Sequence, residues 1–88
     1  MGHLKEAINI GEKLERQLNE VDITTIDELK AVGSRDAWLR ILMRDPSACF
    51  MRLCALEGAI LGIRWHNLDD DTKAKLKAFY NEHKVGKK

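Results

Sequence analysis

The turn before the first expected helix combines residue types that can hold a phosphate group. Its sequence is Ile8-Asn9-Ile10-Gly11. A glycine here lets a ligand come close to the backbone, and the N–H groups at the start of the following helix point at an anion, aided by the helix dipole. Such a contact reads no base sequence, because it is made to the phosphate backbone. The candidate DNA-binding residues are Asn9, Ile10, Gly11, Lys13 and Arg16.

The charges close to this turn argue against a phosphate. Lys13 and Arg16 are the cations of the following helix, which also carries three glutamates: Glu12, Glu15 and Glu20. Attraction of an anion to a helix N-terminus is worth about 1 kcal/mol, and neighbouring negative charge can cancel it. The local charges therefore favour a second interpretation, in which Gly11 is a structural bend.

A second group of cations lies at the C-terminal end. The net charge is +1, yet residues 1–33 carry four Lys or Arg against seven Asp or Glu, and residues 73–88 carry six against one. Clustered cations supply most of the free energy of backbone binding. This end could touch nucleic acid if the last helix folds beside Arg64 and Lys13, although a solvated helix face and a frayed tail is the favoured interpretation.

Other chemically capable side chains lack the spacing that a reaction needs. His3, His66 and His83 are widely separated, and no Cys/His spacing fits a zinc site. The run Asp69-Asp70-Asp71 is better explained as a helix cap than as a metal site. The chain contains no recognisable nucleophile motif, P-loop or dinucleotide fingerprint. We therefore predict a protein that is not an enzyme, with no catalytic residue, metal, cofactor or small-molecule substrate.

Cysteine usage and hydropathy bear on the compartment. Cys49 and Cys54 are five positions apart on an expected helix, which turns them about 140° away from each other, so we predict two unbridged, buried side chains. Two cysteines are few for a small secreted domain. No apolar run reaches the roughly 20 residues that cross a bilayer, and no signal pattern opens the chain. These features predict a cytoplasmic protein without membrane contact.

Helices must position all of these residues, because the apolar spacing is helical throughout and never alternating. We expect a single all-α domain, a compact orthogonal bundle of about five short helices. The first runs from Gly11 to about Asp22, and a capping box at Thr25–Glu28 begins the second, which ends at Gly33. Ser34 is expected to cap the third helix, which stops at Asp45 because Pro46 follows.

The remaining two helices are an apolar one and a basic one. The fourth is expected to begin at Ser47 and to continue through Ala48–Ile63, where almost every position is apolar, so that it needs cover on most sides or a second chain. Trp65 is expected to anchor the following loop in the core. One of the three aspartates then caps the last helix, whose apolar stripe is Leu76, Phe79 and Tyr80.

Small residues on the apolar helix allow a close approach by another helix. Gly58 and Gly62 have G-x-x-x-G spacing, and Ala55 and Ala59 keep the adjoining surface small. Tight packing within the monomer is one use of this seam, and self-association into a homodimer is the other.

The order of these elements resembles a known family. Residues 8–33 resemble a helix-hairpin-helix element, and most of the chain is similar to the C-terminal domain of the TfoX/Sxy proteins. The resemblance divides the single domain 1–88 into that element, a helical remainder at 34–83 and a basic tail at 84–88. The segments that carry the similarity are Asn9-Ile10-Gly11, the turn and helix start at 25–29, Ala37 with the apolar run after it, 55–59, and Gly62 followed by Trp65 and Leu68.

This resemblance implies regulation and no catalysis, in a family associated with natural competence for DNA uptake. In that family an N-terminal α/β domain often precedes this one, and the chain has no room for it. Two positions depart from the expected pattern: Asp22 stands where the family commonly has Gly, and Asn9 stands where DNA-binding hairpins usually have the first of two glycines. Asn can adopt left-handed backbone geometry, so the turn is expected to survive.

The expected function is therefore that of a non-enzymatic regulatory binding module. We expect it to act through contact with a protein partner or through self-association. The acidic first half and the apolar helix favour this interpretation. The alternative is weak, sequence-independent DNA binding through the backbone amides of residues 9–13. Salt separates the two alternatives, because phosphate contacts weaken steeply as salt rises and apolar association does not.

Overall fold

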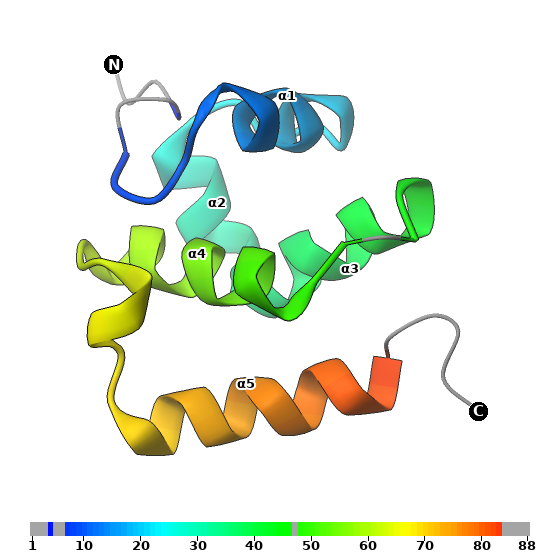
Figure 1. Ribbon diagram of the computed structural model, residues 1–88. Coiled ribbons are helices and arrows are strands. Elements are labelled where there is room, and N and C mark those ends of the chain that lie inside the picture. Colours follow the sequence, from blue (N-terminus) through cyan, green and yellow to red (C-terminus); the bar gives the residue numbers. More distant parts are fainter. Residues whose placement is uncertain (1–3, 5–6, 47, 84–88) are drawn as a thin grey trace.

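Five α-helices and one short 3₁₀ helix form the described part of the chain. The computed structural model describes Leu4, residues 7–46 and residues 48–83. No strand element occurs among these residues, so the predicted all-α bundle of about five helices is confirmed. The helices are α1 (Glu12–Glu20), α2 (Ile26–Val32), α3 (Ser34–Arg44), α4 (Phe50–Leu61), η2 (Trp65–Asn67) and α5 (Asp70–His83) (Figure 1).

Helix α4 is the centre of the fold. It packs against α2, α3, α5 and η2, while α1 packs mainly on α3. In Figure 1, α1 and α5 lie on opposite sides of α4. The apolar composition of α4 predicted this central place, because a helix that is apolar nearly all round must be covered on most sides.

The turn between α1 and α2 depends on an aspartate with positive φ. Helix α1 ends at Glu20, two residues earlier than expected, and Asp22 has φ 69°. This left-handed geometry favours glycine and is otherwise visited mainly by Asn and Asp, whose short polar side chains tolerate it. Asp22 therefore adopts the left-handed geometry of this turn at a position where the TfoX/Sxy proteins commonly have Gly. The buried residues of α1 are Leu14 and Leu18, which lie on its inner face.

The predicted capping box starts α2. The Thr25 hydroxyl accepts a hydrogen bond from the backbone N–H of Glu28 at 3.1 Å. The Glu28 carboxylate reaches one residue further back than the usual box, and accepts from the backbone N–H and the hydroxyl of Thr24 at 2.7 and 2.9 Å. These hydrogen bonds, the one from the Thr24 backbone first, lower the pKa of Glu28 below its ordinary value.

This capping arrangement predicts a pH dependence of stability. Because the pKa of Glu28 is lower in the folded chain, its carboxylate stabilises the fold at pH values above the ordinary pKa of a glutamate, and that contribution is lost as the pH falls through the folded value. A Glu28→Gln variant is expected to be less stable than wild type at pH 7 and to approach it under acid. Urea unfolding of both chains measures the difference. A Glu28 carboxyl titrating by NMR at or above the ordinary value would contradict the prediction.

The corner between α2 and α3 corrects one expectation. Ser34 is the first residue of α3 and not its cap, because a single residue, Gly33, separates the two helices and caps both. Gly33 has φ 94°, which only glycine adopts without strain. Ser34 is buried, and its hydroxyl donates a 2.5 Å hydrogen bond to the Glu57 carboxylate. The side chain therefore ties α3 to α4.

Helix α3 ends as predicted, and α4 is shorter than predicted. Asp45 follows the last residue of α3, directly before Pro46. Helix α4 begins at Phe50, after Cys49, and ends at Leu61, where the following Gly62 caps it with the left-handed φ of 77°. It is therefore shorter at both ends than the apolar run 48–63, because the hydropathy of a residue does not report whether its backbone is helical. The expected start at Ser47 falls on a residue outside the described ones.

The two cysteines are unbridged, as predicted, but only one is buried. Cys54 faces the core, and burial raises the pKa of its thiol. Cys49 is exposed, contrary to expectation, because it precedes the first turn of α4 and does not lie on the helix's inner face.

Trp38 of α3 is the largest fully buried side chain among the described residues. Its indole is fully buried, packs against Phe79 and Tyr80 of α5 at ring-centroid distances of 6.1 and 5.6 Å, and donates a 3.2 Å hydrogen bond from Nε1 to the Cys49 carbonyl. Asp69 caps α5 by accepting from the Thr72 N–H at 2.8 Å, as predicted for one of the three aspartates. Other fully buried side chains come from α1, α2, α4 and α5: Leu18, Leu29, Leu53, Leu56 and Leu76.

Candidate functional site

Asn9 joins the N-terminal turn to the loop after α4. Its backbone has φ 73°, as expected for an Asn in this turn. The Asn9 amide nitrogen donates to the Ile63 carbonyl at 2.8 Å, and its amide oxygen accepts from the Trp65 N–H at 3.2 Å. Both ends of the amide are thus bonded within the chain, so Asn9 holds the turn in place.

Gly58 makes room for this junction. A Cβ at this position would lie 2.5 Å from the Asn9 amide nitrogen, 2.7 Å from the Ile63 carbonyl oxygen and 3.2 Å from the Trp65 Cα. Real Cβ atoms essentially never come as close as the first two distances. The glycine therefore allows the N-terminal turn and the loop after α4 to meet directly on top of the helix.

The start of α1 has no side-chain cap. Gly11 occupies the capping position, is exposed, and has an ordinary φ of −92°. A Cβ there would meet nothing within 4 Å, so the packing of the described residues does not demand this glycine. The first N–H groups of a helix lack partners within it and attract anions. Ile10 is buried beneath the turn, which removes it as a contact residue.

A cleft of about 420 Å³ lies beside this helix start. Lys13 of α1, Arg52 of α4 and Arg64 of the following loop line it, together with Gly11 and Trp65. Among the described residues no carboxylate lines the cleft. Arg52 is held by a 3.0 Å ion pair with Asp45, whereas Lys13 and Arg64 are exposed and have no ion pair within the described part of the chain.

The cleft brings together only part of the predicted DNA-binding set. Asn9, Gly11 and Lys13 line it, Ile10 is buried, and Arg16 is exposed on α1 outside the lining. Arg52 was missed by sequence reasoning, because it lies far along the chain and inside an apolar run. Arg64 and Lys13 do share a surface, but that surface adjoins α1, and no described residue of α5 lines it.

The lysines of α5 are engaged elsewhere. Lys73 donates to the His66 carbonyl at 3.2 Å, Lys75 pairs with Asp71 at 3.2 Å, and the Lys77 ammonium sits 4.9 Å from the centroid of the Phe50 ring. Such contacts are those of a solvated helix face. The expected basic tail, residues 84–88, lies outside the described residues.

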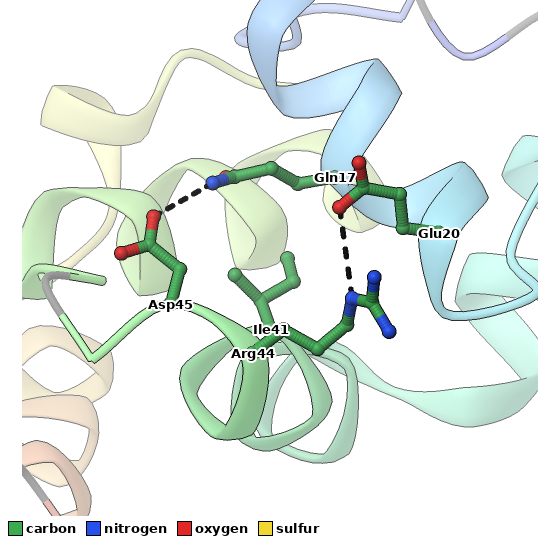
Figure 2. Close-up of a pocket in the computed structure, with 5 residues that line it drawn as sticks. All are labelled: Gln17, Glu20, Ile41, Arg44 and Asp45. Carbon is green, nitrogen blue, oxygen red and sulfur yellow. Dashed lines mark hydrogen bonds and ion pairs between the residues drawn. The ribbon is translucent and has the colours of Figure 1, made fainter.

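A second concavity, of about 350 Å³, lies between α1 and the end of α3 (Figure 2). Its polar groups mostly face one another: the Gln17 amide nitrogen donates to Asp45 at 2.8 Å, and Arg44 pairs with Glu20 at 3.6 Å, with Ile41 between them. The Gln17 amide oxygen is buried and has no hydrogen-bond partner among the described residues. These contacts hold α1 against α3, and each charged side chain among the described lining residues has a partner.

The small-residue seam of α4 is used inside the monomer. Ala55, Gly58 and Ala59 are buried against the chain's own elements, and Gly62 is exposed at the helix end. The apolar side chains that do reach solvent lie elsewhere. Met43, Met51 and Leu61 are exposed over 86%, 55% and 54% of their surface. Trp65 is partly buried against the core, which confirms its expected anchoring role.

The described residues show neither a metal-binding cluster nor a membrane-spanning helix. No group of three or more His, Cys, Asp or Glu side chains within 7–46 and 48–83 is arranged to hold a metal ion. In the same part of the chain, no helix has the length and hydropathy that crossing a bilayer requires.

Fold and cleft together define a small all-α domain with a cationic concavity at the start of its first helix. The chain belongs to the TfoX C-terminal domain family, whose model matches residues 1–80. This is a regulatory-type domain family and not a family of enzymes.

Two solved structures, both from Listeria monocytogenes, are similar to this chain. One is an uncharacterized protein in a triclinic crystal form, with 49% identity, a TM-score of 0.91 and 92% of each chain covered. The other is a protein of unknown function in a tetragonal form, with 51% identity, a TM-score of 0.88, and 90% of this chain and 98% of that one covered. Comparison with curated proteins gave no match.

Proposed function

We propose that this domain is a non-enzymatic module that binds the phosphate backbone of nucleic acid without reading its sequence. The cleft beside α1 carries the proposal: it is lined by Lys13, Arg52 and Arg64 and by no carboxylate among the described residues. Cations next to uncapped helix N–H groups form the kind of site that binds phosphate.

The fold changes the balance of positive and negative charge around Gly11. Along the sequence, Gly11 is flanked mainly by glutamates of α1, which favoured a structural bend. In the folded chain two arginines from α4 and its loop are added to the same surface. Arg52 is offset by Asp45, so the surplus charge comes mainly from Lys13 and Arg64. Two or three phosphate contacts support weak binding with a modest salt slope, roughly −0.9 per contact on duplex DNA.

Contact with a protein partner, or self-association, is the second candidate function. Met51 and Leu61 of α4 favour it, because more than half of each side chain is exposed. Apolar contacts of this kind release few counterions, so association through them should change little with salt. The small-residue seam does not add to this candidate, since three of its four residues are covered within the monomer.

Fluorescence anisotropy of a labelled duplex, at low and at physiological salt, tests the phosphate proposal. Arg64→Glu is expected to weaken binding at low salt by about tenfold, because it reverses a charge that faces the ligand. Gly11→Glu should weaken it as well, and Gly11→Ala should not, because open space surrounds the position.

The control is Lys30→Glu, the same charge reversal at an exposed lysine of α2 that does not line the cleft. Equal loss of affinity in Lys30→Glu and Arg64→Glu would show that overall charge governs binding and would contradict the cleft. Absence of duplex and single-strand binding even at low salt would overturn the proposal. Salt-insensitive sedimentation as a dimer would then favour the second candidate.

A further inference from the structure

The cleft beside α1 has an apolar wall as well as cations. Its lining includes Trp65, Met51, Leu14 and Ala55 next to Lys13 and Arg64. Met51 is more than half exposed, and Trp65 is only partly buried. A groove that merely followed a phosphate backbone would not need apolar residues such as Trp65 and Met51 in its lining. The combination suits a ligand that joins a flat apolar group to a phosphate.

The size of the cleft fits one such unit. Small-molecule sites commonly measure about 300–1,000 Å³ and combine apolar and aromatic walls with a few polar groups, and this cleft of about 420 Å³ lies toward the lower end. Nucleobases stack on aromatic side chains whatever their sequence, because every base presents a π-face.

The two ends of the cleft are fixed relative to each other. Asn9 lies two positions before Gly11, and its side chain bonds to the backbone of Ile63 and Trp65 on either side of Arg64. The start of α1 and the loop that carries Arg64 and Trp65 are therefore joined before any ligand arrives. A preformed site loses little conformational freedom on binding, which favours affinity.

From these observations we infer that the cleft holds one unstacked nucleotide of a single-stranded nucleic acid. The phosphate lies against Lys13, Arg64 and the start of α1, and the base lies against Trp65 and Met51. The inference rests on the proposed function and narrows its ligand. Duplex DNA is a poorer occupant, because its bases are paired and stacked and cannot reach a concave wall unless they are flipped out.

Tryptophan fluorescence tests the inference directly. Trp38 is fully buried and does not line the cleft, so a ligand-dependent change in emission reports on Trp65. The probes are a thymidine oligonucleotide, a duplex of equal length and thymidine monophosphate, each titrated at low salt. The single strand is expected to bind at least about fivefold more tightly than the duplex and to quench Trp65. The monophosphate is expected to quench only at much higher concentration.

Two variants test the base-binding wall. Trp65→Leu should reduce the single-strand affinity to about the level of the duplex. Because Trp65 also packs against the core, Met51→Ser accompanies it: Met51 is exposed, so this variant should fold normally and lose part of the single-strand preference. Thermal unfolding monitored by circular dichroism checks the fold of both variants.

The outcomes separate this inference from the proposed function. If the duplex bound as tightly as the single strand and did not quench Trp65, the inference of an unstacked nucleotide would be wrong. The proposed binding of the phosphate backbone would still stand. If the monophosphate quenched Trp65 and the strand did not bind, a single strand would be excluded as the ligand. A free nucleotide would then be the occupant of the cleft. Absence of salt-sensitive binding to every probe would overturn both proposals.

Discussion

A Gly58→Ala variant is expected to lose about 2 kcal/mol of its free energy of unfolding. The added methyl would sit 2.5 Å from the Asn9 amide and 2.7 Å from the Ile63 carbonyl oxygen, so these groups must move apart. Overpacking of this kind costs about 1–3 kcal/mol, and the Asn9–Ile63 hydrogen bond adds about 1 kcal/mol when it breaks. Alanine's higher helix propensity offsets about 1 kcal/mol at most.

Urea unfolding followed by far-ultraviolet circular dichroism measures this loss. The matched control is Gly11→Ala, where the same methyl enters open space at a negative φ, and its stability should change by less than about 1 kcal/mol. A Gly58→Ala variant as stable as wild type would mean that the N-terminal turn does not lie against α4 as described. The variant should also bind nucleic acid more weakly, because the cleft depends on that turn.

The second large effect is expected for Trp38→Ala, at about 4 kcal/mol. The indole is fully buried, packs against Phe79 and Tyr80, and donates a hydrogen bond to the Cys49 carbonyl. A domain of this size has roughly 5–15 kcal/mol of stability, so the loss approaches the whole margin at the lower end of that range. We expect a chain that is substantially unfolded at 37 °C.

Trp38→Phe serves as the graded comparison. It keeps an aromatic ring in the core but removes the Nε1 donor and part of the volume, so a loss of about 1–2 kcal/mol is expected. Thermal unfolding of both variants, followed by near-ultraviolet circular dichroism, measures the ranking. If Trp38→Ala melted within a few degrees of wild type, the aromatic cluster between α3 and α5 would not be the centre of the core.

Local signals predicted most of the helix boundaries. Thr25 and Asp69 cap their helices with their own side chains, and Pro46 ends α3 through its own ring geometry. Each of these effects acts within about four residues, so it is visible in a short stretch of sequence. Ser34 was misassigned because its role depends on Glu57, which only the packing of α3 against α4 brings near.

The cleft was only partly predictable for the same reason. Gly11 and Lys13 were identified from one turn and its following helix. Arg52 could not be connected with them, because it stands in an apolar run whose direction relative to α1 is set by tertiary packing. The spacing of residues indicates which side chains share a helix face, but it does not show which faces of different helices meet. Arg64 was considered beside Lys13, though together with the wrong helix.

The hydrogen bonds of Asn9 also bear on how the chain folds. They join residues 54 and 56 positions apart, across most of the molecule, whereas Thr25 and Asp69 bond to residues three positions away. Closing so long a loop costs chain entropy that is recovered only once α4 and its following loop are in place. The Asn9 junction therefore belongs to the late stages of folding, after the central helices have packed. We therefore expect the cleft beside α1 to be completed only by the final docking of the N-terminal turn.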